Sequence, residues 1–184
     1  MKKIAKTSHS KLEIKKSTFI AYLCEFKEYK KLLQELKKEH PKAVHFVYAY
    51  RYLNDNKQVV EDKSDDNEPK NSAGLPCLNV LRGAELIDTA AVVLRYFGGI
   101  KLGVGGLIRA YSSALNLAIQ EAEFVNFELK ESISLKIKIK DFNKFKHTCL
   151  KNDINFNSTF CEEEVFISLN LNEKEKEVLK QYLS

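Results

Sequence analysis

The stretch RYFGGIKLGVGGLIRAY, residues 95–111, contains five of the seven glycines of the 184-residue sequence. It begins at the end of an apolar run, residues 89–96, whose composition predicts a buried strand. After it, apolar residues recur at spacings of three and four up to Ala122, which predicts a long helix. This order of strand, glycine-rich loop and helix start is typical of sites where backbone N–H groups and a helix dipole attract an anion.

The glycines of this loop are candidate anion-binding positions. Glycine is used where the backbone needs a positive φ or where another group approaches the main chain closely. The two common nucleotide-binding patterns are absent, because no G-x-x-x-x-G-K-[ST] occurs and Ile108 stands where G-x-G-x-x-G requires its third glycine. We therefore predict an anion site of another kind, built on Gly98, Gly99, Gly103, Gly105 and Gly106.

The cations near the loop have two interpretations, which the sequence leaves open. Arg109 falls in the first turn of the predicted helix, where a cation opposes the helix dipole at a cost of roughly 0.3–1 kcal/mol unless an anion is near. That anion is either an internal carboxylate or an external phosphate. The internal candidates are Asp65, Asp66 and Glu68. In the external interpretation, phosphates are contacted by Lys15, Lys16, Arg95, Lys101 and Arg109.

The chain divides into two predicted domains, residues 1–124 and residues 125–184. In the first, β-branched, aromatic and periodically spaced apolar residues predict further strands at 16–25 and 43–53 and further helices at 26–40 and 76–83. The polar stretch 54–70 has no periodicity and is predicted to be a surface loop.

The second domain begins a new pattern with alternating apolar residues from Ile133 to Ile139. The predicted order of strand, helix, strand, strand and helix is that of a ferredoxin-like domain without its usual last strand. Asp141 is the expected N-cap of the first helix, and Asn172 with Glu175 predicts a capping box at the start of the second. The fold class expected for the whole chain is α+β.

Charge and composition favour an anionic partner in the cytoplasm. The net charge is +5, and up to Phe124 there are 20 Lys and Arg residues against 15 Asp and Glu residues, with 10 against 10 after it. A basic surface attracts polyanions, although it also serves solubility. No apolar run approaches the roughly 18 residues of a membrane span, and the N-terminus lacks the apolar block of a signal peptide. We expect a cytoplasmic protein that does not engage membranes.

Conventional catalytic and metal sites are not predicted. The four cysteines are far apart and form no C-x-x-C pair. His45 lies on a strand that is apolar on both faces, which favours a core histidine over a general base. The acidic run at 61–68 lacks the spacing of a calcium loop. We expect no catalytic residue, no cofactor and no metal.

Four stretches resemble the YigZ/IMPACT family: IKKSTFIAYL (14–23), HPKAVHFVYAY (40–50), SDDNEPKNSAGLP (64–76) and VVLRYFGGIKLGVGGLIRAY (92–111). The resemblance implies an N-terminal domain like the second domain of a small-subunit ribosomal protein and domain IV of elongation factor G. It also implies a ferredoxin-like C-terminal domain similar to domain V of that factor. In eukaryotic relatives the resemblance implies an additional domain that restrains an amino-acid-starvation kinase, and we expect no such domain in this chain.

The sequence departs from the family's pattern at two places. Asn67 and Asn71 replace glycines, and asparagine is the residue other than glycine that best tolerates left-handed backbone. The family's frequent His-His-Cys is His45, Phe46 and Val47 here, which weakens a catalytic or metal-binding role for this cluster.

The resulting hypothesis is a binding protein that engages RNA, a ribosome or a translation factor without performing chemistry. Two alternatives stay open. One is an enzyme or binder of a small phosphorylated ligand at the glycine loop, and the other is a module that docks on other proteins.

Overall fold

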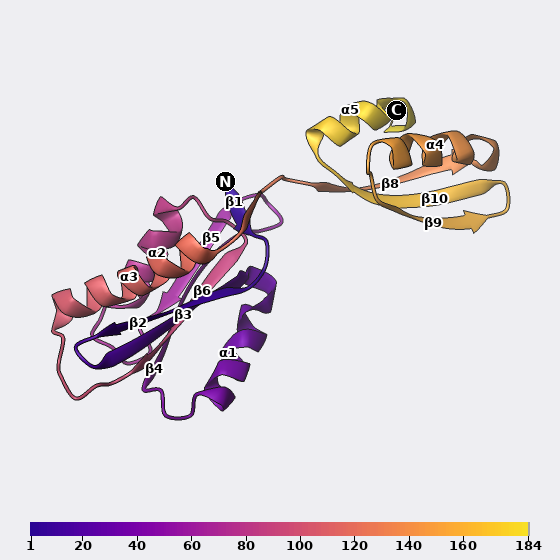
Figure 1. Ribbon diagram of the computed structural model, residues 1–184. Helices are drawn as coiled ribbons and strands as arrows, with labels where there is room; N and C mark the ends of the chain where they lie inside the picture. The colour runs from indigo at the N-terminus through magenta and orange to yellow at the C-terminus, as the bar shows by residue number, and fades with distance from the viewer. Residues whose placement is uncertain (184) are drawn as a thin grey trace. The chain divides into compact units, whose positions relative to one another are not determined.

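The computed structural model describes residues 1–183 and separates them into two compact units, Met1–Phe127 and a second that begins at Glu128 (Figure 1). The α+β class predicted from the sequence is confirmed. Each unit has its own sheets, helices and core. The sequence predicts a domain boundary after residue 124. In the structure β7 (Phe124–Asn126) pairs with β1 (Lys2–Ile4), so this strand belongs to the first unit.

The first unit is built on a five-stranded antiparallel sheet with the strand order β2-β3-β6-β4-β5. Its strands are β2 (Ser8–Ile14), β3 (Ser17–Glu25), β4 (His45–Leu53), β5 (Val59–Ser64) and β6 (Thr89–Tyr96). A short 3-10 turn (Phe26–Glu28) leads into α1 (Tyr29–Glu39), and the other helices are α2 (Gly74–Gly83) and α3 (Val104–Glu121). In Figure 1, α2 and α3 cover one face of the sheet and α1 lies on the other.

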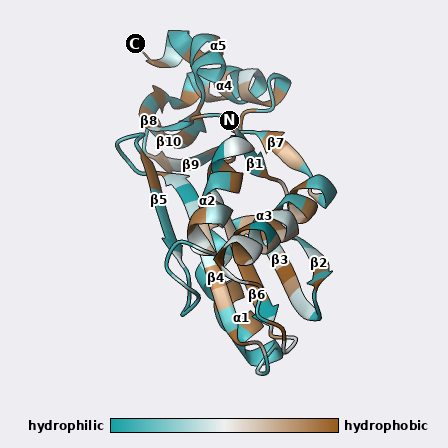
Figure 2. Ribbon diagram, turned by 90° about the vertical axis from the view of Figure 1, so that its left-hand side faces the viewer, coloured by the Kyte–Doolittle hydropathy of each residue, from teal (hydrophilic) through white to brown (hydrophobic). Residues whose placement is uncertain are grey.

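The central strand β6 is apolar on both faces because helices cover both. Ala91 and Val93 join the main core with residues of α2 and α3, whereas Val92 and Leu94 pack with Leu36 of α1. Apolar residues accordingly gather on β3, β4 and β6 in Figure 2. The prediction of a buried central strand from the run 89–96 is therefore confirmed.

Two strands of the sheet differ from what the sequence predicts. β5 falls inside the stretch 54–70, so the prediction of a loop there is wrong for its residues. β5 is an edge strand that pairs only with β4, and its Glu61, Asp62 and Lys63 interrupt the apolar alternation from which strands are recognised. β2, the opposite edge, is not predicted by the sequence either; its seven residues alternate between exposed positions and positions that are buried or partly buried.

The second unit has a three-stranded antiparallel sheet of order β8-β10-β9 and two helices. The elements are β8 (Glu131–Lys138), α4 (Ile139–Lys151), β9 (Phe156–Cys161), β10 (Glu164–Leu171) and α5 (Glu173–Leu183). This is the predicted order, and within residues 128–183 no fourth strand joins the sheet.

Of the two capping predictions for the helices of the second unit, one is wrong and one is confirmed. Asp141 is not the N-cap of α4, because the helix begins at Ile139 with Lys138 as its cap and Asp141 in its first turn. The capping box of α5 is confirmed. The Asn172 side chain accepts a hydrogen bond from the Glu175 N–H, and the Glu175 carboxylate accepts one from the Asn172 N–H, both at 2.8 Å.

Among residues 1–183, no helix is long and apolar enough to cross a bilayer.

Candidate nucleic-acid interface

The Lys15–Lys16 turn and the glycine loop lie against each other, although more than 80 residues separate them in sequence. The two lysines form the two-residue connection of the β2–β3 hairpin, and both have positive φ, 46° and 68°, as a hairpin turn of type I′ requires. β3 pairs with β6 in a register that sets Thr18 opposite Tyr96, so the turn meets the start of the loop. The Gly98 N–H donates to Ser17 Oγ at 3.2 Å.

Gly98 and Gly103 each have a backbone reason to be glycine. A Cβ atom at Gly98 would overlap the backbone of Lys16, so no other residue permits this approach. Gly103 has φ 71° and precedes α3 as its N-cap, without a side-chain hydrogen bond at the cap. The N–H groups of the first turn of α3 therefore remain available to a ligand.

Four of the five predicted basic residues are exposed around this loop: Lys15, Lys16, Lys101 and Arg109. Within residues 1–183, none of the four forms a hydrogen bond or an ion pair with another side chain. The Arg109 guanidinium lies near Gly105, which belongs to the first turn of α3. Its Nη1 is 3.8 Å from the position that a Cβ atom would take at Gly105. These cations are thus free to meet an external anion.

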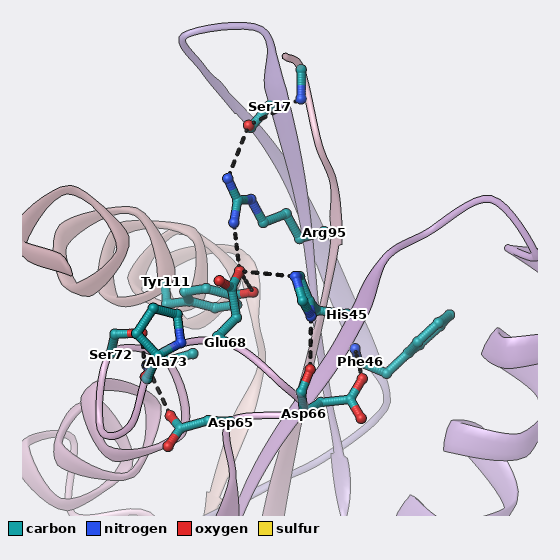
Figure 3. Close-up of polar contacts among 12 residues, drawn as sticks. Ser17, His45, Phe46, Asp65, Asp66, Glu68, Ser72, Ala73, Arg95 and Tyr111 are labelled. Atoms are coloured by element: carbon teal, nitrogen blue, oxygen red, sulfur yellow. Dashed lines mark hydrogen bonds and ion pairs between the residues drawn. The ribbon is translucent and has the colours of Figure 1, made fainter. Parts of the chain in front are cut away.

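The prediction that Arg95 contacts a phosphate at the surface requires correction. Arg95 is only 5% exposed, and its Nη1 donates to Glu68 Oε1 at 2.6 Å (Figure 3). Its position on β6 is directly opposite Phe19 on one side and His45 on the other, on the face that α2 and α3 cover. Arg95 therefore takes the internal role, with Glu68 as its anion.

Asp65 and Asp66 are the other candidate internal partners. Their carboxylates accept hydrogen bonds from backbone N–H groups and not from arginine. Asp65 accepts hydrogen bonds from three N–H groups, those of Asn71, Ala73 and Gly74, at 2.7–3.0 Å. Asp66 accepts one from the Phe46 N–H at 2.6 Å. Both carboxylates thereby fix the segment that carries Glu68.

The two asparagines that replace glycines in this segment behave as expected. Asn67 has φ 68° and Asn71 has φ 61°, both in the left-handed region. The turns around Glu68 therefore survive the substitutions.

Glu68 is the centre of a buried polar cluster. Its Oε1 accepts hydrogen bonds from Arg95 and, at 2.9 Å, from the Tyr111 hydroxyl, and His45 Nε2 lies 3.7 Å away (Figure 3). His45 Nδ1 is 2.7 Å from the Asp66 carbonyl oxygen, which accepts a hydrogen bond from the Nδ1–H. Burial, reinforced by the Glu68 charge, raises the pKa of Tyr111, so its hydroxyl stays protonated and donates.

A pocket of about 420 Å³ opens between this cluster and the glycine loop. Its polar lining comes from His45, Glu68, Arg95 and Lys101, and its apolar lining from Phe97, Leu102, Val104 and Leu107. The size lies in the lower range of small-molecule sites. The basic surface and this pocket share the loop and the start of α3.

The sequence did not indicate His45, Phe97 and Tyr111 as residues of the site. The sequence favours a core histidine at this position, and the His45 side chain is only 16% exposed, but it also lines the pocket. Phe97 is an aromatic residue within the glycine loop that stays 50% exposed, and an apolar residue in that position was a usable signal.

The cysteines of the first unit do not contribute a nucleophile to the site. Cys24 and Cys77 are buried, and burial raises the pKa of Cys24 to about 12 and that of Cys77 further. Both therefore remain protonated thiols at neutral pH. Within residues 1–183, no three His, Cys, Asp or Glu side chains group as metal ligands.

Comparison with known proteins identifies the class of the first unit. Residues 15–119 match the Impact N-terminal domain, a range that runs from the Lys15–Lys16 turn through α3.

Relatives extend the match to nearly the whole chain. The chain is 30% identical over 184 residues to the IMPACT family member YvyE of Bacillus subtilis, covering 98% of this chain and 84% of that protein. It is 32% identical over 178 residues to an IMPACT family member of Haemophilus influenzae, covering 94% and 85%. A solved structure described as that of a hypothetical protein is similar with a TM-score of 0.73 and 28% identity, covering 98% and 89%. The chain belongs to the IMPACT family.

Proposed function

We propose that this protein binds RNA through its phosphate backbone, with the exposed cations around the glycine loop as contacts, and that this binding serves translation. The observation that carries the proposal is that Lys15, Lys16, Lys101 and Arg109 are exposed and unpaired within residues 1–183. Cations without internal partners gain most from an external polyanion. The link to translation rests on the family resemblance, which implies domains similar to parts of a small-subunit ribosomal protein and of elongation factor G.

The backbone geometry supports the same role. Gly98 brings the Lys15–Lys16 turn against the loop, and the uncapped start of α3 adds N–H groups beside Lys101 and Arg109. Phosphate oxygens accept hydrogen bonds both from Lys and Arg side chains and from helix N-termini. Such contacts position a nucleic acid without reading its sequence.

The test is the salt dependence of RNA binding, measured by fluorescence anisotropy with a labelled RNA. If about four phosphates are neutralised, the logarithm of the affinity falls with the logarithm of salt concentration at a slope near −3. The double variant Lys15→Asn/Lys16→Asn removes two charges with a residue that tolerates the positive φ of the turn. Its slope is expected to be less steep by roughly 1.5.

A matched control removes two lysines from α1, on the other face of the sheet. Lys30 and Lys38 are exposed there, and the variant Lys30→Gln/Lys38→Gln has the same net charge as the turn variant. Its slope is expected to stay near that of the wild type. A flat salt response, or an equal loss in both variants, contradicts the proposal. A protein that only docks on other proteins gives no RNA signal at all.

A further inference from the structure

We propose that the pocket between β4, β6 and the start of α3 holds one nucleotide, with the base against Phe97 and the phosphate at Lys101 and the first turn of α3. The nucleotide is either free or an unpaired residue of an RNA. In its RNA form the inference rests on the proposed function; in its free form it does not. Three features of the pocket support it: an unused acceptor, an exposed ring and a cationic rim.

The interior of the pocket offers hydrogen-bonding groups that the protein leaves unused. Polar side-chain atoms of Arg95, Tyr111 and His45 all lie within 3.7 Å of Glu68 Oε1. The other oxygen, Oε2, makes no hydrogen bond within residues 1–183, and it is not among the side-chain atoms sealed from solvent without a partner. Because Glu68 lines the pocket, Oε2 opens into it as an acceptor for the N–H groups of a base edge.

Arg95 is a second buried group with one hydrogen-bonding atom left unpaired. Its Nε–H is buried without a hydrogen-bond partner, although Arg95 is one of the lining residues and its guanidinium is otherwise paired with Glu68 and Ser17. A buried donor left without a partner is destabilising, so natural proteins keep few of them. Because this Nε atom is sealed from solvent, a ligand reaches it only after neighbouring side chains shift.

Phe97 provides a flat apolar surface at the entrance. It is 50% exposed, and the Arg95 guanidinium lies 5.5 Å from its ring centroid. A base that stacks on this ring binds more tightly for that contact, whichever base it is. Leu102, Val104 and Leu107 extend the apolar wall.

The rim of the pocket suits a phosphate. Lys101 lines it without an internal partner in residues 1–183, and Gly103 leaves the start of the 18-residue α3 without a side-chain cap. A cation and free N–H groups therefore meet beside the stacking surface. A nucleotide combines an anion, a flat ring and N–H donors, and this pocket has a counterpart for each.

A larger hollow of about 510 Å³ on the sheet of the second unit does not show this combination. Its lining contains one cation, Lys130, and one aromatic ring, Phe156, with serine, asparagine and aliphatic side chains, but no carboxylate or imidazole. Size alone therefore does not single out a ligand site in this protein.

The free form is tested by calorimetric titration of the full chain with guanosine 5′-monophosphate, whose base edge carries adjacent N–H donors. Micromolar affinity is expected, with inorganic phosphate alone at least tenfold weaker. Phe97→Leu keeps the apolar volume and removes the ring, so affinity is expected to fall about tenfold, within the range for a lost base stack. Phe160→Leu, at a phenylalanine of the second unit that is 57% exposed, is the control and leaves affinity unchanged.

The RNA form is tested by comparing a single-stranded RNA with the same sequence in a duplex. The wild type is expected to prefer the single strand, and Phe97→Leu is expected to abolish that preference while the salt slope remains. Binding of either ligand that depends on Phe97 supports the pocket and tells which source it uses. If neither depends on Phe97, the pocket proposal fails, whereas phosphate-backbone binding stands or falls separately on the lysine variants.

Discussion

Gly98 is in backbone contact with Lys16, and a Cβ atom at Gly98 would lie 2.0 Å from the Lys16 carbonyl carbon. Real Cβ atoms do not come that close to backbone, so the contact exists only because residue 98 has no side chain. Through this contact the glycine loop sets where the two lysines of the hairpin turn lie. The loop therefore affects the basic surface without any of its own atoms carrying charge.

Gly98→Ala is expected to destabilise the first unit by about 2–3 kcal/mol, because the added methyl forces the turn or the loop to move. Urea unfolding followed by tyrosine fluorescence measures this, since seven of the eight tyrosines lie in Met1–Phe127. The control is Gly83→Ala, where nothing lies within 4 Å of the added atom, and its stability is expected to be unchanged or higher by up to ~1 kcal/mol. Equal stability of the two variants would show that the turn moves freely.

Glu68→Ala is expected to cost about 3–5 kcal/mol, because it leaves the buried Arg95 guanidinium without its counter-ion. The Tyr111 hydroxyl loses its acceptor as well. The comparison is Glu123→Ala, which removes the partner of Lys6 in an exposed ion pair and is expected to change stability by less than about 1 kcal/mol. The same urea unfolding measures both. A loss of less than 1 kcal/mol in Glu68→Ala contradicts the buried pair.

How far the sequence predicts the fold depends on where each element lies. β6 and α3 are recognisable because both lie in the core and their apolar spacing is uninterrupted. β5 is not, because an edge strand with one neighbour carries Glu61, Asp62 and Lys63 among its six residues. Its strand character comes from pairing with β4, which a local pattern does not contain.

The candidate site is less predictable, because it joins segments that are far apart in sequence. The sequence indicates Lys15, Lys16 and the glycines as candidate anion-binding positions, but their contact depends on the β3–β6 register. For Arg95, the position in the strand pattern already indicates an internal role. It follows Val93 by two residues in a strand apolar on both faces, so its side chain points toward the covered face. An internal carboxylate was therefore the better expectation for it.

Asp65→Asn is expected to reduce stability at neutral pH and to make it less dependent on acid. Burial acts to raise the pKa of Asp65, but hydrogen bonds from the backbone of Asn71, Gly74 and Ala73 outweigh it and lower the pKa below its ordinary value. The folded state therefore binds fewer protons than the unfolded state as the pH passes through these values. The stability from Asp65 is fully present above the unfolded pKa, near 4, and is lost as pH falls through the folded pKa.

The measurement is urea unfolding of the wild type and Asp65→Asn between pH 7 and pH 3. The two stabilities are expected to differ most at pH 7 and to converge at the acid end. Asp55→Asn serves as the control, since Asp55 is exposed and makes no hydrogen bond or ion pair within residues 1–183. A difference that stays constant over this range would mean that Asp65 acts through packing and not through its charge.

Asn172→Ala is expected to loosen the start of α5 by about 1 kcal/mol, the usual cost of losing an N-cap side chain. The Glu175 N–H then has no acceptor at the cap, although the Glu175 carboxylate still receives the N–H of residue 172. Hydrogen exchange of the full chain, followed by mass spectrometry, should show α5 amides exchanging about fivefold faster while those of α1 keep their rate. Lys174→Ala changes an exposed residue of the same turn and is expected to leave α5 exchange as it is. If both variants exchange at the wild-type rate, α5 is held by Leu179 and its packing in the core, and the capping box contributes nothing that can be measured.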